Sequence, residues 1–200
     1  MDHKLVIVAL IVYLIGSIPF AFILTKIFGH GDIRNIGSGN IGATNVLRTG
    51  NKLLTVFVLI FDILKGYLPT FFILNYLFYI NTNEITNYAL GSVAIFGHLF
   101  PCWLKFKGGK GVATYIGFLF AVNYILGLFF VFSWLFIAFL KKYSSISSII
   151  SLIFIPILML FLSYKPSICL FFAILSIVLI IKHYPNIRRL LNKSEPKIKI

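Results

Sequence analysis

Long apolar runs separated by short polar segments make up this chain of 200 residues. A helix needs about 20 apolar residues to span a bilayer, so such runs predict membrane-spanning helices. The first run is longer than the about 7–15 apolar residues of a signal peptide, and no soluble domain follows it. Five of the runs contain at most two charged residues each, and they cover residues 5–25, 53–80, 85–104, 143–164 and 166–181.

A sixth run, residues 111–140, is long enough for one helix or for two short ones. Basic residues near helix ends favour the cytoplasm. If the run crosses twice, turning near Asn123, 15 Lys/Arg are cytoplasmic and only Lys4 and Lys165 are external; a single crossing gives 8 against 9. We therefore predict an all-α polytopic membrane protein of seven transmembrane helices, with short fourth and fifth helices, an external N-terminus and a cytoplasmic C-terminus.

The composition points the same way. Hydrophobic residues make up 60% of the chain, the mean hydropathy is +0.99, and only 12% of residues are charged, about half the share in soluble domains. Five carboxylates are too few for EF-hand or two-metal sites, and Cys102 and Cys169 lie far apart. We expect no metal or cofactor, a lipid bilayer and not nucleic acid as the partner, and one monomeric transmembrane domain over residues 1–200.

A glycine-rich segment, residues 31–48, lies between the first two apolar runs. It matches GxGxxG, but the dinucleotide-binding motif needs a preceding strand, and here a membrane helix lies on each side. The glycines favour instead a loop that takes positive φ angles and aims successive N–H groups at an anion, and Arg34 and Arg48 add charge. The alternative is a flexible basic loop at a lipid surface. The candidate anion-binding residues are Gly37, Ser38, Gly39, Asn40, Gly42, Thr44, Asn45 and Arg48.

A second glycine-rich segment, residues 106–114, lacks the spacing of a Walker A loop. Its three glycines bracket Lys110 at the predicted start of a helix, where the positive helix N-terminus favours anions. The alternative is that its lysines are ordinary cytoplasmic anchors. The candidate residues are Lys107, Gly108, Gly109, Lys110 and Gly111.

Other polar residues also lie at the predicted cytoplasmic face. His98 is near the end of the third helix, and His183 and Asn186 begin a basic C-terminal segment whose alternative role is anchoring to anionic lipid. We assign Arg189 to that anchoring. Within the second run, Asp62 and Lys65 are spaced to pair with each other, because an unpaired charge inside a membrane is costly. Ser144 and Ser145 are weak candidates.

The polar segments together resemble a known family. In chain order they are GSIPFAFI, DIRNIGSGNIGATNVLR, FDILKG, GHLFPCWLKFKGGKGVATYIG, KKYSSISSI and a C-terminal HxxNIxRLL…EPKI. They are similar to motifs of the bacterial acyl-phosphate-dependent glycerol 3-phosphate acyltransferases (the PlsY family), from about residue 16 to residue 199. The HxxxxD pattern of another acyltransferase class is absent from the sequence.

The resemblance implies seven helices in the bacterial cytoplasmic membrane and a reaction at the cytoplasmic face. Acyl-phosphate and glycerol 3-phosphate are the implied substrates, and lysophosphatidic acid and phosphate the products. It also implies that Ser38, Arg48, His183, Asn186 and either Lys107 or Lys110 bind the phosphate of glycerol 3-phosphate. The sequence departs from the family at Tyr184–Pro185, where an arginine and an acidic residue are usual, and at residues 192–194, where a glycine-containing turn is usual.

The implied reaction uses an activated acyl donor, so it needs no nucleophile from the protein. The base for the hydroxyl is then His98, His183 or a phosphate oxygen of the acyl-phosphate, and we favour the phosphate. The competing function is a small anion channel or phosphate-ester transporter with Arg48 and Lys110 as selectivity residues. That function requires polar residues through the depth of the membrane, whereas polarity here gathers at one face.

Overall fold

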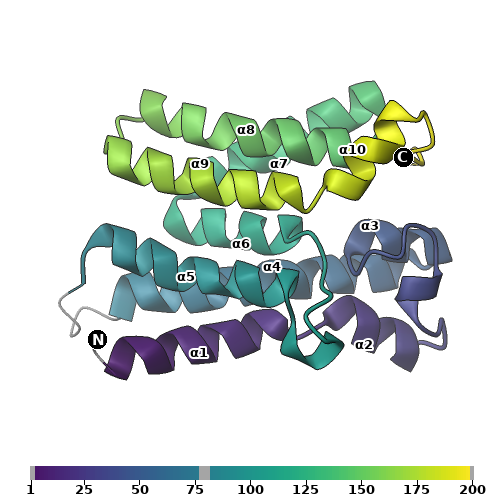
Figure 1. Ribbon diagram of the computed structural model, residues 1–200, viewed down its shortest axis with the longest axis horizontal. Helices are drawn as coiled ribbons and strands as arrows, with labels where there is room; N and C mark the ends of the chain where they lie inside the picture. The colour runs from purple at the N-terminus through teal and green to yellow at the C-terminus, as the bar shows by residue number, and fades with distance from the viewer. Residues whose placement is uncertain (1–2, 77–81, 199–200) are drawn as a thin grey trace. The chain divides into compact units, whose positions relative to one another are not determined.

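The computed structural model describes residues 3–76 and 82–198. Within these residues the regular secondary structure is entirely helical (Figure 1). The end of the second apolar run, residues 77–80, and Lys199 lie outside the described residues. The chain divides into two compact units, Met1–Val122 and Asn123–Ile200.

The first unit is a helical bundle with a polar loop folded onto it. Its helix α4 packs against α5 and α6, and α1 packs against α5. Three short 3₁₀ turns, Ile33–Asn35, Leu47–Thr49 and Cys102–Leu104, shape the loops. The α-helices are α1 (His3–Ser17), α2 (Phe20–Ile27), α3 (Ala43–Val46), α4 (Lys52–Tyr76), α5 (Glu84–Leu99) and α6 (Val112–Val122).

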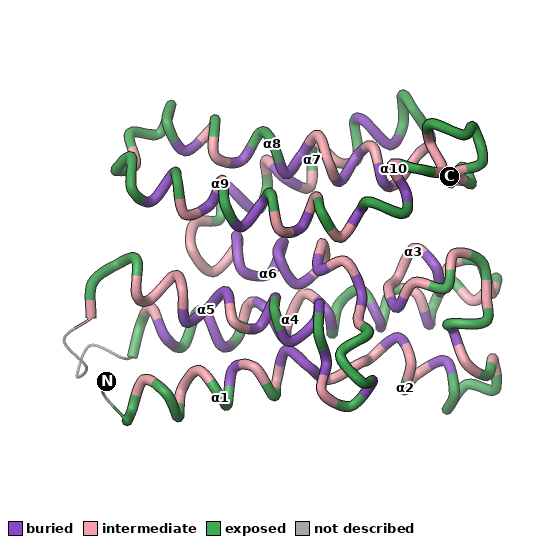
Figure 2. Tube along the Cα trace, in the orientation of Figure 1, coloured by how far each residue is buried: buried purple, intermediate pink, exposed green. Residues whose placement is uncertain are grey.

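Glycines let the helices of this bundle approach closely. A Cβ on Gly66 of α4 would overlap the carbonyl oxygen of Thr114, and one on Gly117 of α6 would overlap that of Ile63. Small residues at helix contacts are the usual means of packing in a membrane, where no hydrophobic force drives helices together. The buried stripes of α4, α5 and α6 follow from this packing (Figure 2).

The first glycine-rich loop is fixed by apolar side chains. Ile33, Ile41 and Val46, from the loop and its short helices, are at most 5% exposed and pack with Leu54 and Val58 of α4. Burying an aliphatic side chain contributes about 1.5–3 kcal/mol. The loop is therefore an ordered part of the first unit. This contradicts the alternative prediction of a flexible basic loop at a lipid surface.

The second unit consists of α7 (Tyr124–Lys141), α8 (Ser144–Phe161), α9 (Pro166–Ile181) and α10 (Tyr184–Leu191). Two hydrogen bonds join α7 to α8: Ser133 Oγ donates to Ser151 Oγ at 2.8 Å, and Trp134 Nε1 donates to Ser148 Oγ at 3.0 Å. The C-terminal segment returns to the turn between α7 and α8, where the N–H of Ile198 donates to the carbonyl of Lys142 at 2.8 Å.

The predicted division of the 111–140 run is confirmed. Helix α6 ends at Val122, and Asn123 caps α7 by accepting a hydrogen bond from the N–H of Ile125 at 2.9 Å. The fourth predicted helix is short, at 11 residues. The fifth is not: α7 has 18 residues, because the turn lies nearer the start of the run than its middle.

Two other predicted boundaries move at prolines. The first run breaks into α1 and α2 at Pro19, and the third helix ends at Leu99, two residues before Pro101. Proline has no N–H to donate and restrains the residue before it, so both breaks follow from the ring.

Several helices are long and apolar enough to cross a membrane. They are His3–Ile27, Lys52–Tyr76, Tyr124–Lys141 and Ser144–Phe161, and α9 with α10, bent by 58°, makes a fifth. Phe132, Phe136 and Phe139 are each at least 65% exposed, as expected for side chains that face lipid. The described residues thus form a helical integral membrane protein with four or five such spans.

Candidate active site

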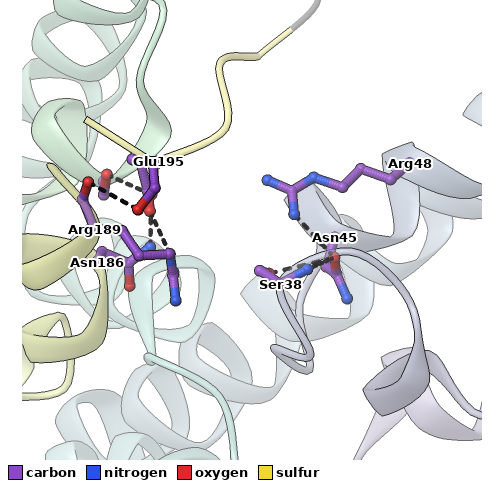
Figure 3. Close-up of polar contacts among 8 residues, drawn as sticks. Ser38, Asn45, Arg48, Asn186, Arg189 and Glu195 are labelled. Carbon is purple, nitrogen blue, oxygen red and sulfur yellow. Dashed lines mark hydrogen bonds and ion pairs between the residues drawn. The ribbon is translucent and has the colours of Figure 1, made fainter. Parts of the chain in front are cut away.

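Asn45 is the centre of the first glycine-rich loop (Figure 3). Its side chain is buried, and its Nδ2 donates to the carbonyls of Ile33 at 3.1 Å and Ile36 at 2.8 Å. Its Oδ1 accepts hydrogen bonds from the N–H of Ser38 at 3.0 Å and from the Ser38 hydroxyl at 3.3 Å. One amide therefore satisfies both sides of the loop and fixes the place of Ser38.

Arg48 folds back over this loop from the 3₁₀ turn that precedes α4. Its Nη1 lies 3.5 Å from Asn45 Oδ1, and a Cβ on Gly37 would lie 2.7 Å from Arg48 Cδ. Gly37 also has a φ of 54°, a backbone conformation that residues other than glycine rarely adopt. The exposed Arg48 is thus near Ser38, as the sequence predicts.

The backbone of the glycine loops differs from the expectation of an anion cradle. The N–H of Ser38 donates to Asn45, that of Gly39 to the Ile36 carbonyl, and that of Gly109 to the His98 carbonyl. The prediction that successive amides aim at one anion is therefore wrong for these three residues. The loops thus use these three N–H groups for their own internal hydrogen bonds.

The remaining glycines also differ in what they do. Gly39 and Gly111 take positive φ angles, as expected, whereas Gly42 has an extended φ of −174° that any residue adopts. Gly42 instead precedes α3, whose residues 43–46 include Thr44, and Asn40 is half-buried in the loop before it.

The second glycine-rich loop touches the first. A Cβ on Gly109 would overlap His98 Nε2 and would lie 2.5 Å from the carbonyl oxygen of Ile41 in the first loop. A Cβ on Gly108 would overlap the carbonyl of His98. Glycine is required at both positions by these close contacts, and His98 at the end of α5 is the residue that both glycines meet.

The lysines of the second loop differ in exposure. Lys110 is half-buried, two residues before α6 begins at Val112, and Lys107 is exposed. The predicted helix start is confirmed, and its positive N-terminal end lies next to Lys110 and Gly111.

Arg34 does not contribute charge to the first loop as the sequence suggested. Its Nη2 lies 2.6 Å from Asp32 Oδ2, and its guanidinium also stacks over the Phe22 ring. The hydrogen bonds from Arg34 lower the pKa of Asp32 to about 2. The pair is neutral as a whole, which leaves Arg48 as the arginine that lies over the loop.

The second unit contains a polar cluster around Glu195 (Figure 3). Its Oε1 accepts hydrogen bonds from Asn186 Nδ2 at 2.7 Å and Ser145 Oγ at 2.8 Å, and its Oε2 accepts one from Arg189 Nε at 2.7 Å. The assignment of Arg189 to lipid anchoring is therefore corrected: it forms an ion pair. Sequence reasoning missed Glu195, although it is the one acidic residue after position 84 in a strongly basic chain.

The electrostatics of Glu195 follow from these donors. Burial raises the pKa of its carboxyl, and the hydrogen bonds from Asn186, Arg189 and Ser145 outweigh burial, so the pKa is lowered from its ordinary value. Glu195 is thus an ionised hydrogen-bond acceptor at neutral pH and a poor general base.

His183 is buried just before α10, and its Nδ1 lies 2.8 Å from the Leu179 carbonyl. A carbonyl only accepts, so Nδ1 carries the proton in this contact. Ser144 is half-buried at the start of α8. Of the candidate residues predicted from the sequence, Asn186 and Ser145 thus lie together, because both donate hydrogen bonds to Glu195.

The family model described as Glycerol-3-phosphate acyltransferase matches residues 6–193. This chain belongs to the glycerol-3-phosphate acyltransferase family. A relative of that name from Pelagibacter ubique (strain HTCC1062) is 50% identical over 196 residues, which is 97% of each chain.

Solved structures from the glycerol-3-phosphate acyltransferase family have the same fold. A crystal structure of PlsY, an integral membrane glycerol 3-phosphate acyltransferase, in its glycerol 3-phosphate form is 37% identical with a TM-score of 0.89, covering 98% of this chain and 96% of that one. The lysophosphatidic acid form is also 37% identical, with a TM-score of 0.85 and coverages of 97% and 95%.

The role of Asn45 in this acyltransferase loop can be tested by Asn45→Asp. The change keeps the acceptor for Ser38 but places a carboxylate oxygen against two carbonyls, so we expect the free energy of unfolding to fall by about 1–3 kcal/mol. The matched control is Asn51→Asp, because Asn51 Oδ1 accepts from the N–H of Leu54 at the start of α4, where aspartate serves equally well. Thermal midpoints in detergent measure both; equal midpoints would contradict the role of Asn45.

The Glu195 cluster can be tested by pH. Because the pKa of Glu195 is lowered in the folded protein, its stabilisation is complete above the ordinary value of 4.5 and is lost as the pH falls below it. We expect Glu195→Gln to have a lower thermal midpoint than the unmodified protein at about pH 7, and the difference to shrink towards about pH 3.5. A difference that stays constant over this range would show that the charge of Glu195 does not matter.

Proposed function

We propose that this chain transfers a fatty acyl group from acyl-phosphate to the 1-hydroxyl of glycerol 3-phosphate, giving lysophosphatidic acid and inorganic phosphate for phospholipid biosynthesis. The observation that carries the proposal is the exposed guanidinium of Arg48 over the ordered Ser38–Asn45 loop. Membership of the glycerol-3-phosphate acyltransferase family and the substrate and product forms of the similar structures support it.

The chemistry needs no nucleophile from the protein. Acyl-phosphate is a mixed anhydride, so the oxygen of the 1-hydroxyl attacks its carbonyl carbon directly. The bond from that carbon to the phosphate oxygen then breaks. The hydroxyl proton moves to an oxygen of the departing phosphate group, and this group is released as inorganic phosphate. The task of the protein is to bind two anions, orient the hydroxyl and stabilise the oxyanion.

In the first unit we assign the phosphate of glycerol 3-phosphate to Arg48, Ser38 and Lys110. Guanidinium binds phosphate through two parallel hydrogen bonds. Lys110 is preferred over Lys107 because it is half-buried beside the N-terminus of α6, whereas Lys107 is exposed. No metal or cofactor takes part.

In the second unit the resemblance implies that His183 and Asn186 bind substrate phosphate, and Glu195 orients Asn186. Glu195 accepts three hydrogen bonds, which makes it a poor base. Glu195 is therefore not added to the candidate bases, and we keep a phosphate oxygen of the acyl donor as the preferred proton acceptor. An anion channel is not favoured, because the family comparison identifies acyltransferases.

We also propose that the protein acts as a monomer and crosses the bacterial cytoplasmic membrane seven times. Helix α6, a shorter apolar helix of 11 residues, and helix α5, of 16 residues, would add two crossings to the five candidate spans. The N-terminus is then external, and both glycine loops and the C-terminus are cytoplasmic. The family model covers both units, which supports a single acyltransferase domain over residues 1–200.

The topology can be tested by cysteine labelling from outside intact cells, in a variant that lacks Cys102 and Cys169. Lys165→Cys should react and Lys142→Cys should not, because the seven-crossing topology, which places most Lys/Arg in the cytoplasm, puts position 165 outside and position 142 inside. Labelling at position 142 with none at position 165 would invert the second unit and contradict the proposal.

The donor can be tested with the purified protein in detergent. Acyl-phosphate and glycerol 3-phosphate together should give equal amounts of lysophosphatidic acid and phosphate, and acyl-CoA should not replace acyl-phosphate. EDTA should leave the rate unchanged. Turnover with acyl-CoA alone, or a loss in EDTA that a divalent ion reverses, would contradict the proposed reaction.

The phosphate site can be tested by Arg48→Ala, which should lower kcat/KM for glycerol 3-phosphate about 10–100-fold, since a charge-assisted pair contributes about 1.5–3 kcal/mol. Arg48→Lys should recover only part of the loss, because an ammonium cannot form the paired hydrogen bonds. The control is Lys52→Ala, an exposed charge in the first turn of α4. If both alanine variants lost activity equally, Arg48 would act only as a surface charge.

A further inference from the structure

Asp62, Lys65 and His98 form a buried ionisable cluster where α4 packs against α5. They are 1%, 4% and 7% exposed. Lys65 Nζ lies 2.7 Å from Asp62 Oδ1, and His98 Nδ1 lies 3.7 Å from the same oxygen. The ion pair predicted from the sequence is thus present, and His98 joins it. Charges at membrane depth are costly even when paired, and the proposed reaction has so far given Asp62 and Lys65 no role.

His98 connects this cluster to the glycine loops. Its carbonyl oxygen accepts a hydrogen bond from the N–H of Gly109 at 3.1 Å. Its Nε2 is so close to Gly109 that it would overlap a Cβ at that position. The Nδ1 side of the ring therefore faces Asp62 and the Nε2 side faces Gly109. A Cβ on Gly109 would also meet the carbonyl oxygen of Ile41, so the imidazole of His98 lies at the point where the second loop approaches the first.

Lys65 and Asp62 contribute differently to the cluster. Lys65 Nζ donates to the carbonyl of Ile18 at 2.9 Å and lies 5.6 Å from the centre of the Phe20 ring. It therefore compensates the charge of Asp62 within α4, while Asp62 is the member of the pair that the His98 ring approaches.

The cluster and the second loop share one small cavity of the first unit. Its lining includes Asp62, Lys65 and His98 together with Gly108 and Gly109. The ion pair and the second loop therefore lie on the walls of the same cavity.

We propose that Asp62 is a positioning residue for the acyl transfer: its carboxylate fixes the imidazole of His98, and His98 holds Gly109 against the first loop. The inference rests on the proposed function. The competing explanation is that the ion pair only stabilises the helices. The two explanations differ when both charges are removed together.

The test compares Asp62→Asn, Lys65→Met and the double variant with the unmodified protein. Each single change leaves one buried charge uncompensated and should lower the thermal midpoint, whereas the double change should restore most of it. If Asp62 positions His98, the double variant should still lose about tenfold or more in kcat. KM for glycerol 3-phosphate should change by less than about threefold, because Arg48 and Ser38 are untouched.

Recovery of both the midpoint and kcat in the double variant would overturn the proposal. The matched control is Asp32→Asn with Arg34→Met, which removes the partly exposed ion pair of the same unit and should leave kcat within about threefold. A tenfold loss of kcat in this control would also count against the proposal.

His98→Gln supplies a variant that leaves the ion pair intact. Glutamine keeps a polar atom near the Nε2 position but lacks Nδ1, so kcat should fall as in the double variant. Adding the Asp62 and Lys65 changes to His98→Gln should lower kcat by less than about a further threefold, since coupled residues are not additive. Independent, multiplying losses would refute the coupling, and so would an unchanged kcat in His98→Gln.

Hydrogen exchange separates this inference from the proposed function. In the double variant the amides of residues 106–112 should exchange about tenfold faster than in the unmodified protein, while those of α8 stay unchanged. Unchanged exchange in residues 106–112 would overturn the positioning role even if acyl transfer is confirmed. Faster exchange in a protein without acyltransferase activity would retain the positioning of the loop and reject the proposed reaction.

Discussion

The close contact of Gly109 with the ring of His98 and the carbonyl of Ile41 is the constraint on which the site of the first unit depends. It joins two loops that lie about 70 residues apart in the sequence, and only a residue without a Cβ fits between them. Glycines have the same role within the helical bundle of the first unit, where Gly66 and Gly117 let the backbones of α4 and α6 approach each other closely. Close helix packing therefore determines where the polar loops at the helix ends can lie.

The few acidic residues have specific tasks in this basic chain. Asp32 pairs with Arg34 in the first loop, Asp62 pairs with Lys65 inside the bundle, and Glu195 binds Asn186 and Arg189 in the second unit. Each of these three carboxylates forms an ion pair with a basic side chain, which suits a reaction between two anionic substrates. A carboxylate that faced the substrates without a partner would repel them.

The sequence predicts the all-helical fold and several local features of the helices, because these depend on local pattern. The break at Asn123, the helix start after Gly111 and the Asp62–Lys65 pair all follow from apolar runs, glycines and helical spacing. Contacts between distant segments were not predictable in this way. The internal use of the Ser38 and Gly39 amides, and the gathering of Ser145, Asn186 and Arg189 by Glu195, depend on tertiary packing that no local pattern records.

Acyl transfer requires that the two glycine loops touch, and the variant Gly109→Ala examines this requirement. One added methyl group would force Gly109 away from His98 or Ile41, and a displacement of about 1 Å at a reacting site can cost about 100-fold in rate. We expect kcat/KM for glycerol 3-phosphate to fall by about that factor while the thermal midpoint and helix content show a folded protein. A folded Gly109→Ala variant whose kcat/KM stayed within about threefold of the unmodified enzyme would contradict the account.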